Sequence, residues 1–319
     1  MGHQEAGAEP RTASRSPSAA VRLRIQRTLN RLGYRVTRIR RASALGMPRA
    51  KQPSLNLSLY DRYPAESLAA RRFYNIGAGS FAHPYWTNLD FSTDWYGTVQ
   101  TAFIGYDLMA LQPLPIESES AELIYSSHTV EHVSQEAVQN MLEESHRALK
   151  PGGGLRITTP DIVLDHAAYR RGDRHYYYWV EMWSRPDRYP QLYKRPPNTE
   201  TITQLFLHHF ASQLCDNDLD DTPPRKYSDD EVDEVFASRP LEEALDYFTS
   251  KCRFNPDHPG NHMNWWSHDK MERCLRAAGF TDIYRSGYGQ SRFAPMRETR
   301  LFDNTHPPIS MYMEAVKAG

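Results

Sequence analysis

The sequence predicts an α/β fold with a mainly parallel sheet that is covered on both faces. Three observations lead to this prediction. Short apolar runs alternate with helical patterns from Phe73 to Asp161, a glycine-rich turn follows the first run, and two more apolar runs lie near the C-terminal end. Strands are expected near residues 72–76, 86–89, 101–106, 121–126 and 154–159.

The clearest helix is expected after Ser134, where apolar and small residues recur at helical spacing. Its buried face is predicted to contain Val138, Met141, Leu142, Ser145 and Leu149, with Lys150-Pro151-Gly152 ending it. A second helix is expected after Ser267, a residue type that caps N-termini, and Gly279 suits its C-terminal end. The segments FTDIYRSGY and ISMYMEAVK predict two closing strands.

About a hundred residues between Asp161 and Asn264 exceed what such a sheet requires. Two helical patterns, at residues 202–209 and 241–248, predict a mostly helical insertion over residues 162–264. The insertion and the residues after it are rich in aromatic rings: Tyr176, Tyr177, Tyr178, Trp179, Trp183, Tyr189, Tyr193, Trp265 and Trp266. Such rings can pack on the C–H faces of sugars, and the alternative is that they fill the insertion's own core.

Composition limits the function classes. A net charge of −1 gives no overall attraction to a polyanion, so nucleic acid is disfavoured as a substrate. Three cysteines without a C-x-x-C pair favour a reduced, cytoplasmic setting. No apolar run approaches the roughly 18 residues of a membrane helix.

Residues 1–52 are predicted to form a basic tail that contains an amphipathic helix. Eleven arginines face only two glutamates in the first 50 residues, and apolar side chains recur at helical spacing at Val21, Ile25, Leu29 and Leu32. Three interpretations stay open: peripheral contact of residues 20–41 with an anionic membrane surface, packing on the rest of the protein, or an organellar transit peptide.

The stretch FYNIGAGSFAHPYWTNLD, residues 73–90, predicts a nucleoside site. Gly77-Ala78-Gly79 follows the first strand, where glycines permit a tight turn and close approach of a ligand. Asp90 ends the next strand, where a carboxylate can accept hydrogen bonds from both ribose hydroxyls. A dinucleotide fingerprint is not met, because Ala82 stands at the third glycine position and only 13 residues separate Gly77 from Asp90.

Five motifs in order resemble the class I S-adenosylmethionine-dependent methyltransferases. They are Gly77 and Gly79, Asp90, Asp107, Glu131-His132-Val133, and Leu149-Lys150-Pro151-Gly152-Gly153. The similarity is greatest to the methyltransferase-11-like group, especially members associated with cell-surface polysaccharide synthesis. The resemblance implies a Rossmann-like sheet with an antiparallel C-terminal edge hairpin, S-adenosylmethionine as cofactor, and methyl transfer to a hydroxyl of a saccharide or glycolipid precursor.

This resemblance also implies an organisation and a cofactor site. Residues 53–161 are expected to form the S-adenosylmethionine-binding core, 162–264 a substrate-binding insertion, and 265–319 the completion of the core. Cofactor-binding positions are expected at strand ends. They are Asn75, Gly77, Ala78, Gly79, Asp90, Phe91, Asp107, Leu108, Ser126 and Ser127.

A hydroxyl acceptor is a poor nucleophile at neutral pH, so its methylation needs a base. His128 directly follows the fourth strand and is the first candidate, as base or metal ligand. Asp161, just after the fifth strand, is the second. The distal histidines His262, His268 and His306 are further candidates to line the substrate pocket.

His128, Glu131 and His132 have the i, i+3, i+4 spacing of one helical face. Small-RNA 2′-O-methyltransferases and ubiquinone O-methyltransferases carry a similar E-x-x-E-H that binds a divalent cation, so the resemblance implies a metal site here, with Mg²⁺ as the ion. The first ligand is His rather than Glu, and histidine-rich sites prefer softer ions. The alternative is that Glu131 and His132 only hydrogen-bond the strand ends.

Two other functions stay open beside sugar O-methylation. One is O-methylation of a small natural product, and the other is a non-catalytic methyltransferase fold that binds cofactor or a partner. The four intact positions Gly77, Gly79, Asp90 and Asp107 favour an enzyme.

Overall fold

The computed structural model describes residues 55–93, 102–184, 193–222 and 225–319. The predicted basic tail, residues 1–52, and the aromatic residue Tyr189 lie outside these ranges. Within the described part, no helix is long and apolar enough to cross a membrane.

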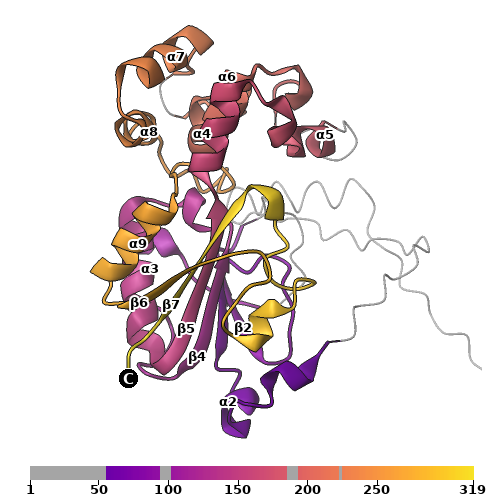
Figure 1. Cartoon of the computed structure of the whole chain (residues 1–319), viewed down its shortest axis with the longest axis vertical. Coiled ribbons are helices and arrows are strands. Elements are labelled where there is room, and N and C mark those ends of the chain that lie inside the picture. Colours follow the sequence, from indigo (N-terminus) through magenta and orange to yellow (C-terminus); the bar gives the residue numbers. More distant parts are fainter. Residues whose placement is uncertain (1–54, 94–101, 185–192, 223–224) are drawn as a thin grey trace, which may run out of the picture. The chain divides into compact units, whose positions relative to one another are not determined.

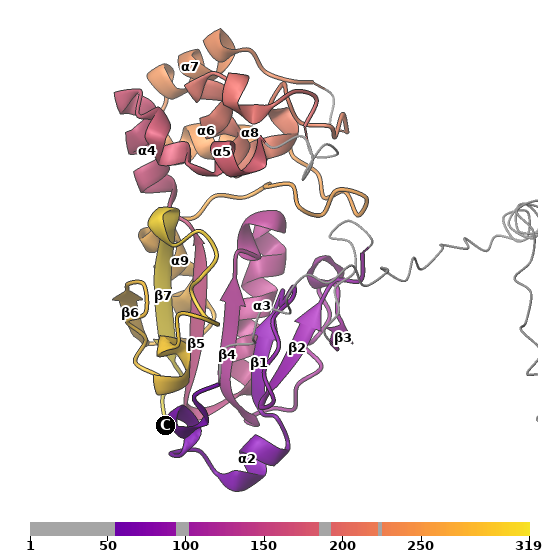
Figure 2. The same cartoon turned by 90° about the vertical axis from the view of Figure 1, so that its right-hand side faces the viewer.

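Among the described residues, seven strands form one sheet in the order β3-β2-β1-β4-β5-β7-β6 (Figure 2). Their bounds are β1 Phe73–Ile76, β2 Trp86–Asp90, β3 Ile104–Gly105, β4 Ala121–Ser127, β5 Leu149–Pro160, β6 Asp282–Ser286 and β7 Ser310–Val316. The strands from β3 to β5 pair in parallel, and β7 runs antiparallel to both β5 and β6. The predicted fold class and its antiparallel edge hairpin are confirmed.

Helices α3 (Gln135–Ala148) and α9 (His268–Ala277) cover one face of the sheet (Figure 1). Both begin as their sequences predict, because Ser134 accepts a hydrogen bond from the backbone of Ala137 and Ser267 from that of Lys270. Gly279 follows α9 with a φ of +99°, which suits a left-handed cap. Four residues of the expected face of α3 are buried, namely Val138, Met141, Leu142 and Ser145. The fifth, Leu149, is also buried but belongs to β5.

Among the described residues, short helices and loops cover the opposite face of the sheet. Phe73, Trp86 and Tyr125 pack there against Tyr60 and Phe302. The covering elements are the short helices η1 (Leu57–Tyr60), α2 (Ala65–Ala69) and η7 (Ala294–Arg297), with the segment after η7. The sheet is therefore enclosed on both sides.

Strand β5 starts earlier than the sequence predicts. The sequence predicts residues 154–159, but the strand begins at Leu149, which pairs with Ala121 of β4. The N–H of Gly152 donates to the carbonyl of Lys317, whose own N–H donates to Gly153. Helix α3 ends at Ala148, ahead of the predicted stop at Lys150-Pro151-Gly152.

The segment after β5 is mostly helical, and its helices gather beyond the carboxyl ends of the parallel strands (Figures 1 and 2). They are α4 Ile162–Arg171, α5 Trp179–Trp183, α6 Ile202–Ala211, α7 Asp229–Ser238 and α8 Leu241–Thr249. These helices share a hydrophobic core of their own, in which Phe206, Phe210 and Phe248 are fully buried.

Candidate active site

The predicted site residues come from the ends of neighbouring strands. Gly77 follows β1, Asp90 ends β2, and His128 follows β4. The backbone N–H of Tyr106 donates to the carbonyl of Asp90 at 2.9 Å, so the segment leading to Asp107 lies beside the end of β2. The parallel order β3-β2-β1-β4 brings these positions to one edge of the sheet.

The glycine turn is left-handed at Gly77 and Gly79, with φ values of +70° and +52°. The two glycines differ in what surrounds them. A Cβ on Gly77 would lie 2.6 Å from Cγ2 and 2.9 Å from Cβ of Thr129, whereas a Cβ on Gly79 would meet no atom of the described residues within 4 Å. Thr129 therefore takes the space at Gly77, and no described side chain takes it at Gly79.

The carboxylate of Asp90 folds back on the glycine turn. Its Oδ2 accepts the N–H of Gly79 at 2.6 Å, and its Oδ1 accepts the N–H of Phe91 at 2.7 Å. Burial raises the pKa of Asp90, and the two hydrogen bonds oppose this shift. Each oxygen retains acceptor capacity that ribose hydroxyls can use.

The next two predicted positions lie at a short helix. Asp107 caps the helix η2 (Leu108–Ala110), its Oδ1 accepting the N–H of Met109 at 2.9 Å, and Leu108 is buried. Phe91, which follows β2, packs edge-on against Phe254 with ring centroids 5.9 Å apart.

The remaining polar positions mostly bind the sheet together. Ser126 donates its hydroxyl to the carbonyl of Ile76, and Ser127 shares a hydrogen bond with Thr158 at 2.9 Å. Asn75 is buried, and its Oδ1 has no hydrogen-bond partner among the described residues.

His128 lies in a constrained position at the end of β4. Its φ is +49°, a left-handed value that is uncommon outside glycine and is concentrated at functional sites. Its Nε2 hydrogen-bonds Oγ of Ser310 at 2.8 Å, and its Nδ1 lies 3.1 Å from Oε1 of Glu131. The side chain is 10% exposed, so its ring is held firmly at the edge of solvent.

Glu131 is a buried carboxylate in the single turn η3 (Val130–His132). Burial by itself would raise the pKa of Glu131, but the combined interactions with His128, His132 and His262 outweigh burial and lower it to about 2. It is therefore ionised at neutral pH. Its Oε2 accepts the hydroxyl of Thr159 at 3.1 Å.

The structure groups the predicted metal ligands differently from the sequence pattern. Among the described residues, Glu131 and His132 form a compact set of donor atoms with His262, all within 4.8 Å of one another. His128 does not belong to this set. His262 comes from the segment between α8 and α9, and no spacing rule links it to residues 130 positions earlier.

Asp161, the second candidate base, caps helix α4. Its Oδ1 accepts the N–H of Val163 at 2.9 Å, and its Oδ2 lies 3.8 Å from Nδ1 of His268. Burial raises the pKa of Asp161. Its carboxylate has a structural role that His128 does not have.

A group of side chains beside His128 was not predicted as a unit. The ring of His306 lies 5.8 Å from that of His128, and Tyr178 hydrogen-bonds Nδ1 of His306 at 2.8 Å. Trp183 lies 6.4 Å from His306 between ring centroids. Tyr178 and Trp183 are partly exposed, so aromatic surface from the helical segment faces solvent near His128.

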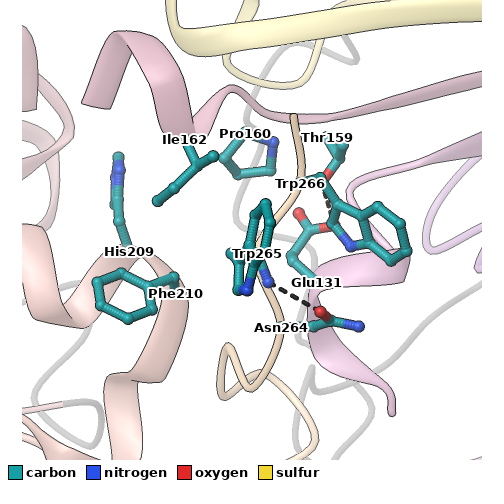
Figure 3. A pocket seen from close by; sticks show the side chains of 9 residues that line it. All are labelled: Glu131, Thr159, Pro160, Ile162, His209, Phe210, Asn264, Trp265 and Trp266. Atoms are coloured by element: carbon teal, nitrogen blue, oxygen red, sulfur yellow. Dashed lines mark hydrogen bonds between the residues drawn. The ribbon is translucent and has the colours of Figure 1, made fainter. Parts of the chain in front are cut away.

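A small cavity lies next to these groups, where β5 meets the helical segment (Figure 3). Figure 3 shows Glu131 and Asn264 on one side, with His209 and Phe210 opposite them. Pro160, Ile162 and the indole rings of Trp265 and Trp266 also line it, and both indoles are buried. These two tryptophans belong to the protein's own packing.

Comparison with known proteins supports the predicted chemistry of the core. The methyltransferase domain family matches residues 78–157. A protein named malonyl-[acyl-carrier protein] O-methyltransferase 1, from Coxiella burnetii, is 30% identical over 122 residues, which are 37% of this chain and 42% of that protein. The chain thus aligns with less than half the length of this curated relative.

Solved structures that align with the chain include S-adenosylmethionine-dependent methyltransferases from two organisms. That from Mesorhizobium loti has 15% identity and a TM-score of 0.34, covering 81% of this chain and 95% of its own. That from Archaeoglobus fulgidus has 12% identity and a TM-score of 0.36, covering 82% and 91%. The family match lies within the predicted core, residues 53–161, and supports the prediction of a methyltransferase, and none of these proteins is named for a saccharide substrate.

Proposed function

We propose that this protein transfers a methyl group from S-adenosylmethionine to a hydroxyl group of a saccharide or glycolipid precursor. The position of His128 carries the proposal. It is a constrained histidine between the nucleoside edge of the sheet and a set of partly exposed aromatic rings.

The methyl donor is assigned to the edge formed by the glycine turn, Asp90 and Asp107. Asp90 would accept hydrogen bonds from the ribose hydroxyls, and no side chain of the described residues lies within 4 Å of where a Cβ on Gly79 would stand. The donor's sulfonium already activates the methyl group, so the protein mainly has to align an acceptor behind it.

His128 is assigned as the base that removes the hydroxyl proton. Glu131, at 3.1 Å, orients its ring and stabilises the imidazolium formed during transfer. At its other nitrogen the ring contacts Ser310, a contact that an acceptor hydroxyl would replace. Asp161 is less suited to this role, because its carboxylate caps α4.

The aromatic side chains Tyr178 and Trp183 are assigned to the acceptor. Their partly exposed rings stand near His306, one ring contact away from His128. Flat aromatic faces pack well on sugar rings, and the phenol can fix orientation by hydrogen bonding. A small ring-bearing natural product would meet the same surface.

A second candidate is methylation of a carboxylate, which is suggested by the name of the Coxiella burnetii relative, a malonyl-[acyl-carrier protein] O-methyltransferase. A carboxylate is already a nucleophile at neutral pH and needs no base. Dependence on His128 therefore separates the two reactions.

The test combines donor binding with turnover. Calorimetry with S-adenosylmethionine should give binding that weakens at least about tenfold in Asp90→Ala, the cost of roughly 1.4 kcal/mol of lost hydrogen bonding. Transfer of labelled methyl to mono- and oligosaccharides should then fall about 10²–10⁴-fold in His128→Ala, with donor affinity unchanged. Absence of donor binding would refute the proposal, and His128-independent turnover of an acyl-carrier-linked carboxylate would favour the second candidate.

A further inference from the structure

Glu131, His132 and His262 come from two segments far apart in the chain and meet behind His128. We propose that these three side chains bind one divalent ion of the zinc type. This ion site is proposed independently of the methyltransferase function, because none of its three ligands is a proposed donor-binding residue.

The two histidines are oriented with one nitrogen each toward the site. Nδ1 of His132 lies 3.3 Å from the carbonyl of Asn261, and Nδ1 of His262 lies 2.7 Å from the carbonyl of His209. A carbonyl only accepts hydrogen bonds, so both Nδ1 atoms carry the proton and both Nε2 atoms keep a lone pair. This backbone support is the arrangement that usually orients metal-binding histidines.

The carboxylate supplies the third donor atom. Oε1 of Glu131 is buried, with Nδ1 of His128 3.1 Å away and Nε2 of His132 3.9 Å away. A carboxylate oxygen can accept more than one interaction, so Oε1 can bind a cation while it keeps its contact with His128. A cation among Oε1 and the two Nε2 atoms would balance the charge of this buried carboxylate.

The backbone holds the two segments in place independently of any ion. The N–H groups of Met263 and Asn264 donate to the carbonyl of Glu131 at 2.8 and 3.2 Å. The rings of His132 and His262 also pack edge to face, with centroids 4.7 Å apart. The donor atoms are thus preorganised, and an ion would have little ordering to impose.

The donor set decides which ion fits. Two imidazole nitrogens and one carboxylate oxygen suit Zn²⁺ or Co²⁺, and three protein ligands leave a fourth position open. Mg²⁺ prefers oxygen ligands in a full octahedron. The site therefore differs from the Mg²⁺ site that the sequence resemblance implies, both in its ion and in having His262 in place of His128.

The test is ion binding by the full chain, stripped with EDTA and titrated with ZnCl₂ against a chromophoric chelator. One equivalent should bind, MgCl₂ in tenfold excess should not compete, and His262→Ala should weaken binding at least 100-fold. The exposed residue His175 provides the matched control, since His175→Ala removes a surface imidazole and should leave affinity unchanged.

Co²⁺ provides a second readout, because the intensity of its visible absorption reports coordination number. The wild-type protein should show strong bands, and His262→Ala should lose them while melting in EDTA at a temperature within a few degrees of wild type. Failure to bind Zn²⁺, or equal binding in His262→Ala, would overturn the proposal. The proposal would also be overturned if His128→Ala lost Zn²⁺ binding and His262→Ala kept it. That result is expected if the ligands are the predicted set of His128, Glu131 and His132. Calorimetry with S-adenosylmethionine on the same variants tests the donor site separately.

Discussion

Substitution of the two turn glycines should have different consequences, because Thr129 stands against only one of them. Both Gly77 and Gly79 have positive φ, so alanine at either position should cost roughly 1–2 kcal/mol of backbone strain. At Gly77 the new methyl group would also enter the volume of Thr129, which adds about 1–3 kcal/mol of overpacking. We expect Gly77→Ala to lose about 2–5 kcal/mol of unfolding free energy and Gly79→Ala about 1–2 kcal/mol.

Urea unfolding followed by tryptophan fluorescence measures these losses, and calorimetry with S-adenosylmethionine measures the donor site. Gly79→Ala should weaken donor binding more than it destabilises the fold, since its methyl group would enter the space that we assign to the donor and would meet no described side chain. Thr129→Gly in the Gly77→Ala background provides the decisive comparison. The double variant should recover part of the loss, with a coupling of about 0.5–3 kcal/mol relative to the two single variants. Equal losses at the two glycines, or no coupling to Thr129, would refute the packing argument.

Two further predictions concern stability. Arg156→Met should lower the unfolding free energy by about 3–5 kcal/mol, because it leaves two buried carboxylates, now 2.6 and 2.9 Å from Arg156, without a partner. The surface variant Arg276→Met should change it by no more than about 0.5 kcal/mol. Urea titrations that give similar losses for the two variants would contradict this prediction. Burial lowers the pKa of His208 to about 3, below the pKa of about 6.5 that a histidine has in the unfolded chain. As the pH falls, the unfolded state therefore binds a proton before the folded state does. The unfolding free energy should fall as the pH drops from about 6.5 toward 3. His208→Leu should reduce this slope by up to about 1.4 kcal/mol per pH unit, and an unchanged slope in melts at pH 7, 6 and 5 would argue against it.

The sheet and the edge that carries the site were predictable because they follow from local rules. Apolar runs of strand length, glycines at a strand end and caps such as Ser134 and Ser267 each act over a few residues. The rule that ligands bind at the carboxyl ends of parallel strands then places Gly79, Asp90 and His128 at one edge. Nothing more distant than neighbouring strands was needed.

The errors and omissions concern contacts between distant segments. The sequence gives a reason for glycine at position 77, yet the structure shows that Thr129, 52 residues later, takes the space. Arg156 alternates with apolar neighbours along β5 as a solvent-facing residue would, but Asp303 and Glu314 pair with it in the interior. Such partners depend on the path by which later segments of the chain fold back onto the sheet. The periodicity of a sequence does not predict that path.

The turn η3 explains why the base and the acceptor surface are expected to act together. The backbone carbonyl of Glu131 receives two N–H groups from the chain returning from the helical segment, and its side chain lies beside His128. Helix α4 starts directly after β5, so the helical segment is attached to the sheet at both of its ends near this turn. A displacement of the helices that carry Tyr178 and Trp183 would therefore also shift Glu131 and the ring that it orients. Acceptor specificity and base alignment are expected to change together when residues 262–264 are altered, because their backbone holds Glu131 in place.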